Sequence, residues 1–502
     1  MSGSANPSVD SDALPQFPTR LGHPKPLWML FMTEFWERFA FYGIRWALVL
    51  YIVAQFHGGD PSGEAPANRT YGAYLALVYA SAIFGGYIAD RVLGYQRSIL
   101  LGAVVMSAGL FMISLPEQHL FELGLATIIC GNGLFKPNIS TMVGKLYGVG
   151  DGRRDAGFTI FYMGINLGGF ISPILTGILA EQVFGSAAMP AYKMVFIASG
   201  VGMLASLVWF WFGRAQLEGI GRPPQDGASR MRVLYVLAGV LAAIPVMYGL
   251  LAMGAGALAW ILGIMFVALC AMLLVEGIRE GKVQRDRTIA MLIIFAFNVL
   301  FWMFFEQAGS SFTFLADKIV DRQFGDWTFP NAWFQSVNSL AIIALAPLIA
   351  MIWVRMGRRN VEPSIPRKFG LGLIFNGLAF LLLMFALSSL VSDAGKIPFW
   401  TLFMVYVIQS IGELCLSPIG LSMVTKLAPV RLVGFGMGGW FLSTGIGNNL
   451  SGIFAGIVSG ESGMTTASAL SGYTFGFYAL VGAGVVLFAI GLLINRLMHG
   501  VK

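Results

Sequence analysis

The chain has 502 residues, of which 57% are hydrophobic and only 11% are charged, and its net charge is +7 at pH 7. Soluble domains carry roughly 25% charged residues, so this composition excludes an ordinary soluble globule. A positive net charge can indicate nucleic-acid binding, but the placement of the basic residues along this chain argues against that class, as shown below.

The chain begins with a polar segment, residues 1–25, which is rich in Ser and Pro. It lacks the charged and then apolar layout of a signal peptide, so we expect a disordered tail. Fourteen apolar stretches follow, each close to the length of about 20 residues that crosses a bilayer. They should be helices, because backbone groups in lipid must be satisfied within the segment. The spans are expected near 27–56, 70–91, 97–115, 120–147, 155–181, 192–213, 233–252, 256–278, 288–316, 329–355, 369–390, 397–425, 432–459 and 470–497.

The order of these spans predicts two similar halves with an insertion between them. A polar stretch with Gly and Pro at 214–230 reads as a cytoplasmic linker. The next two spans carry no charge until Glu276 and are expected to form a lipid-facing, structural hairpin. The predicted parts are a six-helix bundle at 26–213, the linker, a hairpin at 231–285 and a second six-helix bundle at 286–502.

A weak internal repeat supports this division. The loop stretch Gly86–Arg97 of the first half has an echo at Trp353–Arg359 of the second half. Two parallel six-helix halves with a site between them describe the major facilitator architecture, and Gly86–Arg97 resembles the loop motif of that superfamily. The expected fold is therefore an all-α polytopic membrane protein of the major facilitator type, with fourteen transmembrane helices.

Basic residues are distributed very unevenly between the two sides of the predicted membrane. With the N-terminus in the cytoplasm, twenty-four of the 32 Lys and Arg residues fall on the cytoplasmic side, five fall outside and three lie within spans. This bias is what the positive-inside rule requires. It predicts a multi-pass protein of the cell (inner) membrane with both termini in the cytoplasm.

Cysteine and histidine indicate neither a disulfide framework nor a metal centre. Cys130, Cys270 and Cys415 lie in separate apolar spans and are expected to be packing residues. All four histidines lie in loops or at chain ends, so an intramembrane metal site or histidine proton relay is not expected. The groups that titrate within the membrane should be carboxylates.

Charged residues within the spans are the strongest functional signal, because each costs about 2.5–3.5 kcal/mol to insert. In the first span, positions 34, 38, 41 and 45 share one helical face, and Glu37 lies beside it. Two acids near one base leave a surplus carboxylate that could hold a transferable proton, although a static ion-pair cluster is an alternative. The seven intramembrane charges are Glu34, Glu37, Arg38, Arg45, Lys136, Glu306 and Glu413.

These charges are divided unequally between the halves. Lys136 lies beside Pro137 in the fourth span and needs a counter-charge, for which the first-span glutamates are the natural candidates. Arg45 and Lys136 come from the first half, whereas Glu306 and Glu413 lie mid-span in the second half. A cavity that is basic on one wall and acidic on the other suits a zwitterion with separated ends, such as a free peptide. Internal ion pairs could explain the same charges.

Five motifs resemble those of the proton-dependent oligopeptide transporters, a major facilitator family, and the resemblance covers residues from about 27 to 497. The family usually has tyrosine where this chain has Phe41, and many relatives have proline where this chain has Ser339 after Asn338. The motifs are Glu34-x-x-Glu37-Arg38-Phe39-x-Phe41-Tyr42-Gly43, Gly131-Asn-Gly-Leu-Phe-Lys136-Pro137-Asn138, Phe158-Thr-Ile-Phe-Tyr162-Met-Gly-Ile-Asn166-Leu-Gly168, Phe304-Phe-Glu306-Gln307 and Gly412-Glu413-Leu-Cys-Leu-Ser417-Pro418.

The resemblance implies a role for each matching position. Glu34, Glu37 and Arg38 would form the proton-coupling cluster, paired with Lys136 in part of the cycle and linked to Glu306. Arg45 and Glu306 would form an extracellular gate that responds to protonation. The substrate-binding residues implied by the resemblance are Arg45, Tyr42, Tyr79, Lys136, Asn166, Glu306, Asn338, Glu413, Ser417 and Trp440. Among them, Arg45 and Lys136 would meet the peptide carboxylate, Glu413, Asn166 and Asn338 its amino end, and Tyr42, Tyr79 and Trp440 its side chains.

The expected function is proton-coupled import of di- and tripeptides by alternating access. Protons are the expected coupling ion, with no other cofactor, and a monomer in the lipid bilayer is expected. One alternative is a transporter of another small zwitterion or of an anion such as nitrate. A membrane-embedded enzyme is a remote alternative, because no Asp lies mid-span, no His-Glu-x-x-His motif occurs and no histidine lies within the spans.

Overall fold

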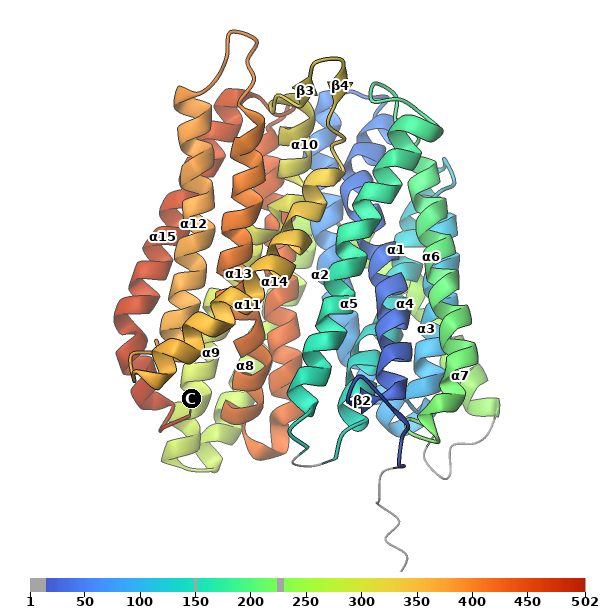
Figure 1. Ribbon diagram of the computed structural model, residues 1–502, viewed down its shortest axis with the longest axis vertical. Helices are drawn as coiled ribbons and strands as arrows, with labels where there is room; N and C mark the ends of the chain where they lie inside the picture. The colour runs from blue at the N-terminus through green and yellow to red at the C-terminus, as the bar shows by residue number, and fades with distance from the viewer. Residues whose placement is uncertain (1–14, 149–150, 224–229, 502) are drawn as a thin grey trace, which may run out of the picture.

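The chain folds into long helices that run side by side along a common axis (Figure 1). The computed structural model describes residues 15–148, 151–223 and 230–501, so residues 1–14 of the predicted tail and 224–229 of the predicted linker lie outside the described residues. Within the described ranges, thirteen helices are long and apolar enough to cross a membrane. Helix α4, Gln118–Lys145, is a further helix of 28 residues that carries the polar side chains Asn132, Lys136 and Asn138.

Six long helices form the half that comes first in the chain. Short π-helical turns at Ala89–Leu93 and Leu179–Val183 extend two of these helices, and 3-10 turns lie at Pro61–Gly63 and Arg214–Leu217. The long helices are α1 (Lys25–Phe56), α2 (Glu64–Ile88), α3 (Tyr95–Met112), α4, α5 (Arg154–Ile178) and α6 (Tyr192–Gly213).

A helical hairpin and the second half follow. The hairpin consists of α7 (Arg230–Ala252) and α8 (Gly254–Arg279), joined by Met253 alone. Only 6% and 17% of the most apolar segments of α7 and α8 are buried, so both helices lie at the periphery of the bundle. The second half comprises α9 (Lys282–Phe305), α10 (Ser311–Lys318), α11 (Trp333–Arg358), α12 (Ile365–Ser389), α13 (Phe399–Leu427), α14 (Val433–Ser459) and α15 (Thr466–Leu497), with 3-10 turns at Glu306–Gly309 and Val430–Leu432 and a strand pair of β3 (Gln323–Phe324) and β4 (Trp327–Thr328).

The span predicted at 288–316 lies within the membrane-crossing segment Lys282–Lys318, and a short turn interrupts the α-helix in the middle of this segment. Helix α9 ends at Phe305, and Glu306 begins a 3-10 turn before α10 starts at Ser311. Non-helical backbone at this depth is tolerated only where protein groups satisfy it. Here Ser310 donates to the Glu306 carbonyl at 3.2 Å. The Ala308 carbonyl accepts from the hydroxyls of Thr313 at 3.2 Å and Tyr406 at 3.3 Å. The break puts Glu306 at a helix end facing the other half.

The last part of the predicted tail is also ordered. Strands β1 (Thr19–Arg20) and β2 (His23–Pro24) pair antiparallel immediately before α1. His23 bonds the Tyr147 hydroxyl at 2.9 Å, and Arg153 donates to the Gly22 carbonyl at 3.1 Å. These tertiary contacts to the end of α4 and the start of α5 order a segment whose own composition favours disorder.

The two halves meet along two seams, where α2 packs against α14 and α5 packs against α11. The first seam depends on glycine, because α2 and α14 approach closely at Gly72 and Gly452. A Cβ added to Gly72 would lie 2.7 Å from the Cα of Gly452 and 2.8 Å from the carbonyl oxygen of Asn448. Small residues of this kind allow helices to approach in membranes, where van der Waals packing replaces the hydrophobic effect between helices.

The close approach at Gly72 predicts that alanine substitutions at two glycines of α2 have different effects on stability. Gly72→Ala should lower the free energy of unfolding by about 1–3 kcal/mol, because the added methyl group overpacks the seam. Gly86→Ala should leave stability unchanged or slightly raised, since nothing lies within 4 Å of its added Cβ. Thermal unfolding of the purified variants in detergent measures this, and equal melting temperatures would contradict the proposed packing.

Candidate functional site

The acidic and basic residues of α1 form a buried ion-pair cluster. Arg38 contacts Glu37 through both Nε and Nη2, and the Nη2–Oε1 distance is 2.6 Å. The same guanidinium lies 3.3 Å from Glu34 Oε1. Asn132 of α4 donates to Glu37 at 3.4 Å. All three charged side chains are almost fully buried, so the cluster faces protein and not lipid, as the helical spacing predicted.

The two glutamates of this cluster are bound unequally. Both oxygens of Glu37 accept hydrogen bonds from Arg38. Glu34 shares only one oxygen with Arg38, and its Oε2 is buried with no hydrogen-bond partner in the described parts of the chain. Glu34 is therefore the less tightly bound of the two carboxylates.

Lys136 of α4 rests on aromatic rings. Its Nζ lies 4.8 Å from the ring centroid of Tyr79 and 6.0 Å from that of Phe41. Within the described residues, no carboxylate lies within ion-pair distance of it, so the first-span glutamates do not neutralise it directly in this conformation. Arg38 also lies 4.7 Å from the Phe41 ring. Cation–π contacts hold the ammonium weakly compared with an ion pair, which leaves it available to an anionic group.

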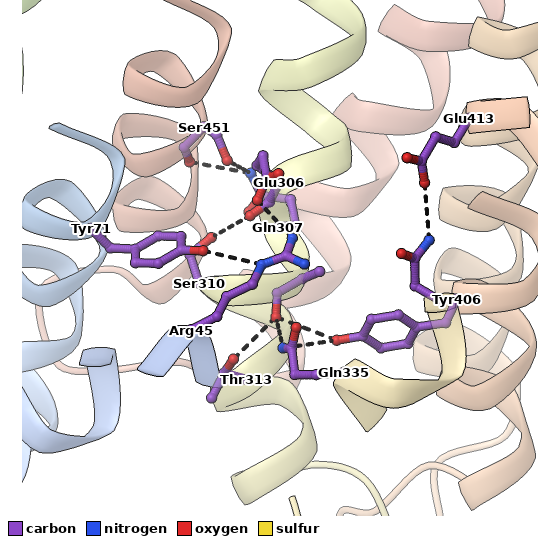
Figure 2. Close-up of polar contacts among 12 residues, drawn as sticks. Arg45, Tyr71, Glu306, Gln307, Ser310, Thr313, Gln335, Tyr406, Glu413 and Ser451 are labelled. Atoms are coloured by element: carbon purple, nitrogen blue, oxygen red, sulfur yellow. Dashed lines mark hydrogen bonds and ion pairs between the residues drawn. The ribbon is translucent and has the colours of Figure 1, made fainter. Parts of the chain in front are cut away.

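Arg45 of α1 and Glu306 form an ion pair that joins the two halves (Figure 2). Nη2 of Arg45 lies 2.7 Å from Glu306 Oε2, and its Nε donates to the Tyr71 hydroxyl at 3.2 Å. The sequence predicted the ion pair through its family resemblance. It did not predict Tyr71, because an aromatic residue in an apolar span carries no distinguishing signal.

Glu413 lies apart from this pair, on α13 (Figure 2). Its carboxylate accepts a hydrogen bond of 3.1 Å from Asn338 Nδ2, which also donates to Ser410 at 2.9 Å. No lysine, arginine or histidine lies within ion-pair distance of Glu413 in the described parts of the chain. The second half thus holds a carboxylate without a cation, and the first half holds Lys136 without a carboxylate.

The remaining predicted substrate-binding residues differ in their surroundings. The Tyr42 ring lies 5.7 Å from the Arg45 guanidinium, so it borders the charged groups. Asn166 donates to the carbonyl of Tyr162 at 2.9 Å, which uses its amide nitrogen within α5. Ser417 Oγ is buried without a partner among the described residues. Trp440 is only 6% exposed and packs against rings of its own half, so the structure makes it a packing residue in this conformation.

One end of the bundle is closed by further contacts that sequence reasoning missed. We call the end away from both chain termini the outer end (Figure 1). There, Lys318 lies 2.6 Å from Glu64, which also accepts from the Met464 N–H at 2.7 Å. Asn68 donates to Ser459 at 3.0 Å. Glu64 precedes the predicted second span and had no reason to be singled out, yet it is buried between the halves.

In the described ranges, no group of three or more His, Cys, Asp or Glu residues could hold a metal ion. The site consists of charged side chains from α1, α4, the 3-10 turn that follows α9, and α13, divided between the two halves.

Comparison with known proteins identifies close relatives. A family model described as the POT family matches residues 96–469. The chain is 35% identical over 468 residues to the peptide transporter YePEPT of Yersinia enterocolitica, covering 88% of this chain and 89% of the relative. It is 34% identical over 429 residues to dipeptide and tripeptide permease B of Aliivibrio fischeri, covering 84% of each.

Solved structures agree with these relatives. The structure of a peptide transporter POT in complex with alafosfalin is 34% identical, has a TM-score of 0.81 and covers 97% of this chain and 98% of its own. The structure of a POT family transporter in complex with 5-aminolevulinic acid is 31% identical, has a TM-score of 0.79 and covers 96% and 99%. The expected major facilitator fold is confirmed.

The unequal binding of the two α1 glutamates predicts different effects on stability. Glu37→Gln should destabilise the protein by about 3 kcal/mol, because it removes the charge that compensates the buried Arg38. Glu34→Gln should have little effect, since it removes a carboxylate whose second oxygen has no donor. Thermal unfolding of both variants tests this. A larger destabilisation by Glu34→Gln than by Glu37→Gln would contradict the unequal binding of the two carboxylates.

Proposed function

The chain belongs to the POT family, and on this premise we propose that it is a proton-coupled symporter that imports di- and tripeptides by alternating access. The names of its relatives, a peptide transporter and a dipeptide and tripeptide permease, support peptide transport. The observation that carries the proposal is the pair of uncompensated charges on opposite halves, Lys136 on α4 and Glu413 on α13. A buried charge without a counter-ion is costly, and an incoming ligand of opposite charge removes that cost.

The peptide binds with its carboxylate toward the basic half and its ammonium toward the acidic half. Lys136 leaves its aromatic contacts to meet the carboxylate, with Arg45 nearby. Glu413 and the Asn338 amide meet the amino end. Asn166 contributes through its carbonyl oxygen, because the peptide ammonium is a donor and needs an acceptor. Tyr42 and Tyr79 border the side chains of the peptide, and Trp440 and Ser417 join the pocket only if the second half rearranges around them.

Proton coupling uses carboxylates on both halves. The Arg45–Glu306 ion pair closes the outer side, and protonation of Glu306 removes the charge that holds Arg45. The outer ends can then separate and admit peptide. A proton on Glu34 leaves the Arg38–Glu37 pair intact, so the cluster of Glu34, Glu37, Arg38 and Lys136 changes charge without losing its structural ion pair. The halves rock around the site as the proton is released inside.

The proposed placement in the cell follows from the charge distribution. The protein is a multi-pass transporter of the cell inner membrane, with both termini in the cytoplasm and the outer end facing outward. It acts as a monomer and uses protons as the coupling ion, without another cofactor. The predicted six-two-six division, with the linker at 214–230, belongs to this proposal.

A second candidate substrate is a small zwitterion other than a peptide. A POT family transporter of similar structure was solved in complex with 5-aminolevulinic acid, which has an amino group and a carboxylate at its two ends. The same pair of charges, Lys136 and Glu413, suits that arrangement. A simple anion such as nitrate is disfavoured, because it leaves Glu413 uncompensated.

Reconstituted transport tests coupling. Dipeptide uptake into proteoliposomes should require an inward proton gradient. Lys136→Ala and Glu306→Gln should each reduce gradient-driven uptake at least tenfold, while dipeptide exchange partly survives in Glu306→Gln, because exchange needs no net proton movement. The matched control is Lys145→Ala, an exposed lysine on the same helix, which should transport normally. Uptake that ignores both pH gradient and membrane potential would refute the symport mechanism.

Blocked peptides test the assignment of the two ends. Amidation of the peptide carboxyl should weaken binding strongly in the wild type but have little further effect in Lys136→Ala, because the contact is already absent. N-acetylation should likewise have little further effect in Glu413→Gln. Competition against a radiolabelled dipeptide measures each affinity. If the loss of affinity caused by blocking one end simply adds to the loss caused by the matching substitution, that residue and that end of the peptide do not meet.

A further inference from the structure

The hairpin α7–α8 lies across the seam between the two halves. Helix α7 packs against α4 and α2 of the first half, whereas α8 packs mainly against α14 and α9 of the second half. The apolar contact of α7 gathers around Val240, which lies against Cys130 and Leu134 of α4. On the other side, a Cβ added to Gly439 of α14 would lie 2.8 Å from Leu269 of α8. Each helix of the hairpin therefore belongs to a different half.

At the outer end of the hairpin, one hydrogen bond joins α7 to the first half and another joins α8 to the second half. The hairpin residues that form these two bonds are only a few positions apart in the chain. Tyr248 of α7 bonds His119 at the start of α4 with a distance of 2.9 Å between the hydroxyl and Nδ1. Ala255 of α8 accepts a hydrogen bond of 2.8 Å from Asn449 of α14. The chain between them turns at Met253 and Gly254, whose φ of 81° permits the tight reversal.

The covalent geometry of this turn limits how far the outer ends of α7 and α8 can separate. Consecutive Cα atoms are 3.80 Å apart, so Ala252 and Gly254 can never be more than about 7.6 Å apart. The inner ends have no such limit. Helix α7 begins at Arg230 and α8 ends at Arg279, and no short connection joins these two ends to each other. At the inner end, α8 is tied to α9 of its own half by the short turn of Glu280 and Gly281.

From this asymmetry we infer that the hairpin is a clip across the outer end of the α2–α14 seam, which limits outward opening and leaves inward opening free. Separation of the outer ends must pull α7 from α4 or α8 from α14, at the cost of the Tyr248 and Asn449 hydrogen bonds and the Val240 contacts. Lipid replaces lost apolar contacts at little cost, so the clip shifts the balance between conformations and does not lock one of them.

Lengthening the clip tests the inference, which rests on the alternating access proposed above. Six Gly/Ser residues inserted between Met253 and Gly254 should raise the outward-open population at least threefold. The matched control is the same insertion between Glu280 and Gly281, a turn within the second half, which should change nothing. Spin labels at Gln118→Cys and Glu461→Cys, one on each half, report the outer separation in a background without Cys130, Cys270 and Cys415.

The outcomes separate this inference from the transport function. A larger long-distance population in the Met253–Gly254 insertion, absent from the control, supports the clip even if no peptide is transported. Tyr248→Phe adds no residues and removes one attachment, so it should shift the distances in the same direction by a smaller amount. Unchanged distances in both variants, with the protein monodisperse, would overturn the clip. If the insertion variant does not fold, Tyr248→Phe alone decides.

Discussion

The structure depends on one constraint: a charged side chain inside an apolar bundle needs a compensating partner. Some of the charges here form ion pairs, and others have only aromatic or neutral polar neighbours. Arg38 with Glu37 and Arg45 with Glu306 are close ion pairs. Lys136 rests on aromatic rings, and Glu413 has only amide and hydroxyl neighbours. The paired charges connect helices, whereas Lys136 and Glu413, on opposite halves, have no partner within ion-pair distance among the described residues.

Two kinds of contact between the halves follow from this arrangement. Polar contacts at the outer end, from Arg45–Glu306 to Glu64–Lys318, can be made and broken by changes in charge. Glycine contacts along α2 and α14 depend on shape, so they can act as a pivot that persists while charges change. The hairpin adds a third kind, a covalent limit at its one-residue turn. Because this limit acts only at the outer end, separation of the two halves is resisted more strongly at the outer end than at the inner end. This difference is present before any substrate binds.

The break between α9 and α10 shows how backbone and charge act together. Ending α9 at Phe305 puts Glu306 where it can reach Arg45. Side chains bind the buried carbonyls of the turn: Ser310 donates to Glu306, and Thr313 and Tyr406 donate to Ala308. An unbroken helix would have satisfied its own backbone but fixed the orientation of Glu306. Glu306 therefore lies on a segment that neighbouring side chains stabilise.

Length and hydropathy in the sequence determined the helical membrane class and the position of most of the long apolar helices, because transfer of about 20 apolar residues into lipid is a local property of each segment. The spacing of Glu34, Arg38 and Arg45 likewise predicted one charged face of α1. Only the tertiary structure decided which charges meet: that Lys136 lies on Tyr79 and Phe41, that Glu34 has the free oxygen, that Glu64 reaches Lys318, and that Trp440 is buried. Pairing between residues far apart in the chain depends on helix packing and on the conformation of the two halves, and neither is encoded in local periodicity.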